Sequence, residues 1–176
     1  MKYLLDNMKL NRTSIKKKLA LVILLLTLSI QSFAQFPERP AQGSLVNDFA
    51  DVLSPQRENQ LLRQLSAFGS QTSTALILVT VPDLNGYDKA QYAVELAHQW
   101  EIGQKGKDNG ILILVKPKTA SSNGEAYIAV GYGLEAVVPD AIAQQIVTYE
   151  MIPEIKANDY FAGFAKASRN LMEITG

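Results

Sequence analysis

Hydrophobic positions along this chain fall into short continuous runs separated by segments with helical spacing. Residues 74–81 and 110–115 are rich in β-branched side chains and leucine, which is typical of strands covered on both faces. Between these runs Ala93, Leu96 and Trp100 recur at intervals of three and four residues, as on one face of a helix. A strand, a helix and a strand in this order predict a parallel pair joined by a right-handed crossover.

A third strand is predicted over residues 126–130, and it should run antiparallel to its neighbour. The connection between residues 111–115 and this strand is polar and contains the turn dipeptide Asn123-Gly124. We therefore expect a β-hairpin whose loop spans residues 116–125.

Capping signals place two helices before the hairpin. The first is predicted to begin at Ser54, whose hydroxyl can cap the helix, with Pro55 at the first helical position, and to end at Gly69. The second is predicted to begin after Asp88 and to end at Gly103.

Two further helices are predicted after the hairpin. One begins at Asp140 and is expected to end near Pro153, because proline removes a helical hydrogen bond. The other is predicted to be capped by Asn158 and carries Phe164 and Leu171 on one face. Together these elements predict an α/β fold, a three-layer α/β/α sandwich with a small mixed sheet.

The N-terminal segment has the pattern of a secretory signal. Three consecutive lysines, residues 16–18, precede the apolar run 19–30, and the small residues Ser32 and Ala34 follow at the spacing that a signal peptidase prefers. The alternative is a membrane anchor, but a helix of this run would span only about 18 Å against roughly 30 Å of hydrocarbon. We expect a signal peptide over residues 1–34 and one domain over residues 35–176.

The composition and charge of the chain exclude several classes of function. The chain has 17 basic and 17 acidic side chains, and six of the basic ones but only one acidic one precede residue 35. The domain therefore has 11 basic and 16 acidic side chains, a net charge of −5. We expect no nucleic-acid partner, because such proteins carry clustered Lys and Arg. The chain has no Cys and one His, which excludes disulfides, thiolate zinc sites and a thiol nucleophile. No later stretch predicts a transmembrane segment, and we expect a monomer in the periplasm or another extracytoplasmic compartment.

The hairpin predicts where polar groups meet. Antiparallel pairing of the second and third strands brings Asp108-Asn109 beside residues 131–135, which read Gly-Tyr-Gly-Leu-Glu. The two glycines permit positive φ angles and close backbone approach, so carbonyl oxygens and the Glu135 carboxylate could face Asp108. Ligands that are all oxygen suit Ca²⁺, which takes six to eight of them at roughly 2.3–2.6 Å.

Ordinary loop chemistry is an alternative explanation of these residues. An Asp-Asn-Gly turn before a strand is common, and Glu135 could favour the N-terminus of a following helix. Lys105 and Lys107 beside Asp108 could hold a phosphate or lie in a solvated loop.

Four blocks of the chain resemble the TPM domain, in the order found in that family. They are residues 46–54, 100–103, 108–115 and 131–135. The resemblance implies a Rossmann-like α/β/α sandwich, export or membrane association, and Ca²⁺ binding through acidic residues of these blocks. The matching positions are Asp48, Asp108 and Glu135 as carboxylate ligands, with Asn109 and Asn47 as weaker candidates. One departure is Glu101, which stands where the family has Gly.

The resemblance also suggests two functions. Plant thylakoid lumen relatives are linked to photosystem II repair and to acid phosphatase activity, and an animal relative modulates a membrane receptor. We therefore expect a non-catalytic Ca²⁺-binding module that acts with a membrane-protein partner in assembly, repair or quality control. The alternative is a metal-assisted acid phosphatase in which Lys105 or Lys107 steadies the anion.

Overall fold

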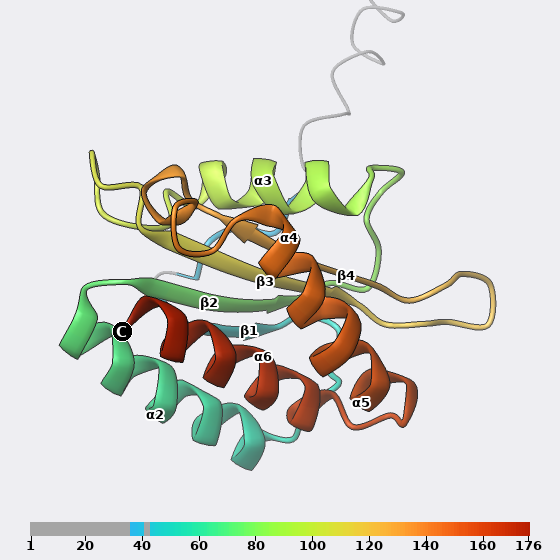
Figure 1. Ribbon diagram of the computed structural model, residues 1–176. Coiled ribbons are helices and arrows are strands. Elements are labelled where there is room, and N and C mark those ends of the chain that lie inside the picture. Colours follow the sequence, from blue (N-terminus) through green and yellow to red (C-terminus); the bar gives the residue numbers. More distant parts are fainter. Residues whose placement is uncertain (1–35, 41–42) are drawn as a thin grey trace, which may run out of the picture. The chain divides into compact units, whose positions relative to one another are not determined.

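The domain is built on a four-stranded mixed sheet. The computed structural model describes residues 36–40 and 43–176, so the predicted signal peptide and its cleavage after Ala34 lie outside the described residues. Strands β1 (Val46–Asp48), β2 (Ala75–Thr80), β3 (Gly110–Lys116) and β4 (Glu125–Val130) lie in sequence order across the sheet (Figure 1). β1, β2 and β3 are parallel, and β4 is antiparallel to β3. The predicted parallel crossover and the predicted hairpin are both confirmed.

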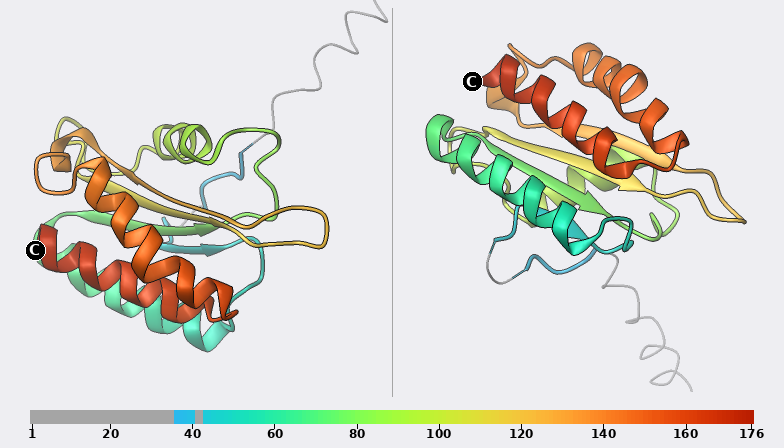
Figure 2. Two further views of the ribbon diagram at one scale, coloured as in Figure 1. Left: turned by 45° about the vertical axis from the view of Figure 1, so that its right-hand side comes forward. Right: turned by 90° about the horizontal axis from the view of Figure 1, so that it is seen from below.

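Helices cover both faces of this sheet (Figures 1 and 2). Helix α3 (Lys89–Gln99) lies on one face, and α2 (Pro55–Thr72) and α6 (Tyr160–Thr175) lie side by side on the other. A continuous helical segment also covers this second face: α4 (Asp140–Gln145), the π-helix η2 (Ile146–Met151) and α5 (Ile152–Lys156). The predicted three-layer α/β/α sandwich is confirmed.

The larger core lies between the sheet and the helices α2, α4 and α6. Strand residues whose side chains point to that face alternate with residues that face α3, as the period of two requires. The fully buried side chains of this core include Leu61, Leu65, Leu78, Ile113, Phe164 and Leu171. On the face covered by α3, Leu96 and Trp100 are also buried, so both faces of β2 and β3 are shielded from solvent.

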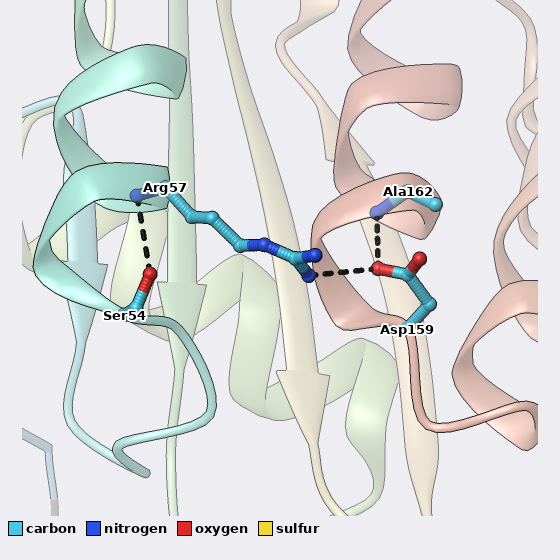
Figure 3. A network of polar contacts seen from close by, with 4 residues as sticks. All are labelled: Ser54, Arg57, Asp159 and Ala162. Atoms are coloured by element: carbon cyan, nitrogen blue, oxygen red, sulfur yellow. Dashed lines mark hydrogen bonds and ion pairs between the residues drawn. The ribbon is translucent and has the colours of Figure 1, made fainter.

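Helices α2 and α6 are linked at their N-termini by polar contacts (Figure 3). The Ser54 hydroxyl caps α2 by accepting from the Arg57 backbone N–H at 3.4 Å. The Asp159 carboxylate caps α6 by accepting from the Ala162 N–H at 3.1 Å, and it also accepts from the Arg57 guanidinium at 3.1 Å. The ion pair is exposed and contributes about 1 kcal/mol or less. It links the first turn of α2 to the residue that caps α6.

The predicted ends of the first two helices were wrong. α2 continues past Gly69 to Thr72, and Ser73 adopts the left-handed conformation that ends it, with φ 64°. α3 ends before Gly103, in a Schellman motif: the Ile102 N–H bonds to the Ala97 carbonyl and Glu101 has φ 48°. In both helices the left-handed residue that ends the helix is not the predicted glycine: it is Ser73 in α2 and Glu101 in α3.

The segment around Pro153 also differs from its prediction. The helix does not end there: the backbone stays helical through the π-helix η2, and Pro153 lies in the first turn of α5 directly after it. Asn158 has φ 62° and ends this helix, while the cap of α6 is Asp159. The cap prediction was wrong by one residue.

Strand β1 was not among the predicted strands. It has only three residues and no β-branched run beyond Val46, so its pattern is too short to distinguish from a loop. Its pairing with Leu78–Thr80 of β2 defines it.

Candidate functional site

The predicted site residues lie at two opposite ends of the sheet. We call residues 101–109 and 131–138 the amino edge, since they flank the start of β3, and the loops after β1, β2 and β3 the carboxyl edge. Asp108, Asn109 and Glu135 are at the amino edge, whereas Asp48 pairs with Thr80 at the far end of β2. Five residues of strand separate the two ends, roughly 17 Å. Asn47 and Asp48 therefore do not share a site with Asp108.

At the amino edge the predicted meeting of two segments is confirmed. The Gly131 N–H bonds to the Gly110 carbonyl at 2.8 Å, and the Gly133 N–H bonds to the Asp108 carbonyl at 3.1 Å. A Cβ on Gly131 would lie 2.1 Å from the Asp108 oxygen, and one on Gly133 would lie 1.9 Å from the Lys107 oxygen. The two glycines allow the two backbone segments to approach closely, as expected. Neither glycine uses the positive φ that it permits, because Gly131 has φ −68° and Gly133 lies outside the left-handed region.

Two carboxylates are presented at this edge. Asp108 is exposed and has φ 47°, a left-handed conformation that Asp tolerates better than most residues. Glu135 is also exposed and directly follows the short 3-10 helix η1 (Tyr132–Leu134). Both side chains are available to a ligand approaching from solvent.

Asn109 has a structural role at the same edge. Its Oδ1 accepts from the Gln104 N–H at 2.8 Å, and its Nδ2 donates to the Ser73 carbonyl at 3.0 Å. Its backbone carbonyl accepts from the Ala75 N–H at 3.1 Å. Asn109 thus ties the loop before β3 to the end of α2, and its side-chain oxygen is already engaged.

Asp48 is engaged in a similar way at the carboxyl edge. Its Oδ2 accepts from the Leu53 N–H at 2.7 Å, and its Oδ1 accepts from the Thr80 hydroxyl. The same hydroxyl accepts from the Ala50 N–H at 3.0 Å. These bonds hold the loop between β1 and α2 against the end of β2, so Asp48 stabilises a turn.

Asn47 is buried behind this loop, with 5% of its surface exposed. Its Nδ2 donates to the Ser44 carbonyl at 3.0 Å and more weakly to the Leu78 carbonyl at 3.4 Å. Its Oδ1 finds no hydrogen-bond partner among the described residues. The amide secures the chain entering β1 and does not reach the exposed amino edge.

A cluster of acidic side chains surrounds the start of α2. Burial raises the pKa of Glu58 first, and the charges of Asp48 and Asp51 raise it further. Within residues 36–40 and 43–176, however, no three His, Cys, Asp or Glu side chains are grouped so as to hold a metal ion. A cation would therefore depend on a carboxylate pair together with carbonyl oxygens or water.

Two features escaped the sequence interpretation. Tyr132, between the glycines of the amino edge, is 80% exposed, and Val137 further along the same segment is 48% exposed. At the carboxyl edge, Lys89, Lys118 and Lys156 line one groove although they are far apart in sequence. The Gly-Tyr-Gly pattern could have indicated an exposed tyrosine, but no local pattern connects the three lysines.

The part of the chain that the structure describes contains no helix with both the length and the apolar content needed to cross a membrane.

Comparison with known proteins finds a matching family model and similar solved structures. A family model named TPM_phosphatase and described as the TPM domain matches residues 46–174. The N-terminal domain of a P. gingivalis protein, solved by NMR, is similar at 25% identity with a TM-score of 0.64, over 74% of this chain and 81% of that one. The N-terminal domain of a Corynebacterium glutamicum protein, also solved by NMR, is similar at 12% identity with a TM-score of 0.59, over 82% and 86%. No curated protein matches.

Proposed function

This chain belongs to the TPM domain family, and we propose that it is an exported, non-catalytic module that binds Ca²⁺ at its amino edge. The observation that carries the proposal is the pair of backbone hydrogen bonds that hold the Asp108 and Glu135 segments together. Because both carboxylates are exposed and neither forms an ion pair within the described residues, both are free to bind a cation.

The donor set fits a weak calcium site. Two carboxylates supply at most about four of the six to eight oxygens that Ca²⁺ takes, and carbonyl groups or water must supply the others. Asn109 adds little, because its oxygen already accepts from Gln104. With so few charged ligands we expect a Kd on the order of 10⁻⁴ to 10⁻³ M, the range of extracellular calcium modules.

The same edge offers a surface for a partner. Tyr132 is exposed to solvent, while the glycines on either side of it lie against the neighbouring loop. These backbone contacts fix the position of the tyrosine although its side chain is not buried. Exposed tyrosines are favoured at protein interfaces because they combine an apolar ring with a polar tip. We propose that Ca²⁺ orders this edge for a membrane-protein partner during assembly, repair or quality control.

A Ca²⁺ titration followed by NMR would test the site. The largest shifts are expected at residues 104–110 and 131–137, and the midpoint should move upward by about tenfold in Asp108→Asn and in Glu135→Gln. Asp51→Asn is the matched control, since it removes one exposed carboxylate at the carboxyl edge. Shifts centred on Asp51 and Glu58 would move the site to the other end of the sheet, and no shifts at all would end the calcium proposal.

Thermal unfolding gives an independent measurement. At 10 mM Ca²⁺, a Kd in the expected range should add about 1.4 to 2.7 kcal/mol to the free energy of unfolding. With the tenfold weaker binding expected of Asp108→Asn, the gain should fall to about 0.4 to 1.4 kcal/mol.

Phosphatase activity is a second candidate, favoured by the name of the matching family model and by Lys105 and Lys107 on the loop that carries Asp108. In that case the lysines would hold the phosphate while the cation, when bound, polarises a phosphoryl oxygen. Hydrolysis of a chromogenic phosphate should then fall in Asp108→Asn and in Lys107→Ala. Equal rates in the wild type and both variants would indicate a contaminating enzyme.

A further inference from the structure

A groove of about 740 Å³ lies at the carboxyl edge, away from the proposed calcium site. Its walls come from the hairpin loop, the start of α3, α5 and the start of α6. We propose that this lysine groove, lined by Lys89, Lys118, Lys156, Ile152, Ile155 and Tyr160, binds a short acidic peptide segment of a partner protein.

The charge of the groove is opposite to that of the domain. The domain as a whole carries an excess of acidic side chains, yet three lysines and one glutamate line this groove. Glu125 forms an ion pair with Lys89 at 3.1 Å, which neutralises both. Lys118 and Lys156 form no ion pair in the described part of the chain. Two positive charges are therefore available to an acidic ligand.

A buried lysine shapes the hairpin wall. Lys116 is only 6% exposed, and its Nζ donates to the Ser122 Oγ at 2.7 Å and to the Asn123 carbonyl at 2.5 Å. No carboxylate bonds to this ammonium within the described residues. It fixes the loop that carries Lys118, and it does not itself line the groove.

The groove also has an apolar component. Ile152, Ile155 and Tyr160 line it while packing in part against the main core. They are only half-buried, so each leaves apolar surface that a ligand could cover. A ligand that satisfies the groove must therefore combine acidic groups with apolar side chains.

An acidic peptide fits these features better than a lipid surface does. The groove offers two unpaired lysines on separate elements, whereas binding to an anionic membrane surface typically uses a cluster of about four to eight Lys or Arg on one segment. Asn123, Asn158 and Thr119 on the rim offer polar groups to a peptide backbone. Charge complementarity of this kind determines partner choice and association rate more than it determines affinity.

Binding of labelled peptides would test the proposal. The probe is a fluorescein-labelled pool of short peptides in which Asp or Glu alternates with Leu, Phe or Val, followed by fluorescence anisotropy. The double variant Lys118→Glu and Lys156→Glu should weaken binding by about tenfold or more, since it reverses two exposed charges. The control is Lys105→Glu with Lys107→Glu, an equal change of charge at the amino edge, which should change the Kd by less than about twofold.

Three outcomes would overturn the proposal. They are no binding of the acidic pool, equal binding of a pool with Lys in place of Asp and Glu, and equal losses in the two double variants. Preferential binding to phosphatidylglycerol vesicles that Lys118→Glu with Lys156→Glu abolishes would replace the peptide with a membrane surface. Binding should be unchanged by Ca²⁺ and by Asp108→Asn, so that failure of the calcium site and failure of the groove are distinguishable.

Discussion

Replacement of Asp48 should destabilise the fold without weakening calcium binding. Its carboxylate accepts from the Leu53 N–H at 2.7 Å and from the Thr80 hydroxyl. A hydrogen bond to a charged group contributes about 1.5–3 kcal/mol. Asp48 is partly exposed, so water can replace some of what Asp48→Ala removes. We expect a loss of roughly 2 to 4 kcal/mol in the free energy of unfolding.

The charge and the hydrogen bonds of Asp48 can be separated with amides. Asp48→Asn keeps an acceptor for Leu53 but loses the charge that strengthens the bond, so it should cost about 1 to 2 kcal/mol. Asp51→Asn makes the same change three residues later, where the side chain is exposed and φ is 53°, a conformation that Asn tolerates. It should be neutral or slightly stabilising, because it relieves repulsion of Glu58.

Urea unfolding at constant temperature measures these differences, with equal m values as the check that the comparison is valid. A cycle of Asp48→Ala, Thr80→Val and the double variant should give a coupling of about 1 to 2 kcal/mol. Equal stability of Asp48→Asn and Asp51→Asn would refute the structural role of Asp48. A large loss of Ca²⁺ affinity in the folded Asp48→Asn variant would instead show that Asp48 is a calcium ligand.

Three further predictions concern backbone conformation and pH. Glu101→Gly should raise the free energy of unfolding by about 1 kcal/mol in urea titrations, because φ 48° at the end of α3 favours glycine; a loss would show that the Glu101 side chain stabilises the fold. Gly133→Ala should destabilise the domain by about 2 kcal/mol or more and broaden NMR signals of the amino edge, since its Cβ would lie 1.9 Å from the Lys107 oxygen. Burial, and next the charge of Asp83, raises the pKa of Tyr92 to about 12. A folded pKa above the unfolded value of about 10 means that stability is complete below pH 10 and is lost as the pH rises towards 12. Tyr92→Phe should reduce that loss in urea midpoints measured between about pH 9 and 11, and an unchanged pH dependence would exclude Tyr92 as its source.

Local patterns predicted those parts of the fold whose cause is local. The buried strands around Ile77 and Ile113 were predicted because a short continuous run of β-branched and apolar residues is typical of a buried strand. The caps at Ser54 and Asp88 were predicted because a cap bonds to backbone groups two or three residues away. Strand β1 was missed because its pairing with β2, a contact across the fold, is what makes it a strand.

The candidate site was predictable only where one hairpin determines it. Pairing of β3 with β4 requires Asp108 to lie beside Gly133, whatever the rest of the fold does. The Thr80 partner of Asp48 lies 32 positions away, and the carboxylate has no local feature that distinguishes a ligand from the anchor of a turn. The lysine groove likewise exists only once α5 and α6 pack beside the hairpin.

The pairing of α2 with α6 has a consequence for biosynthesis. Arg57 and Asp159 lie 102 positions apart, and the buried faces of the two helices complete one core. A nascent chain that ends before α6 would lack Phe164 and Leu171, which share the core with Leu61 and Leu65. Contacts between such distant segments also slow folding. The domain should therefore mature only after its full length has emerged, and shortened products should be degraded or should aggregate.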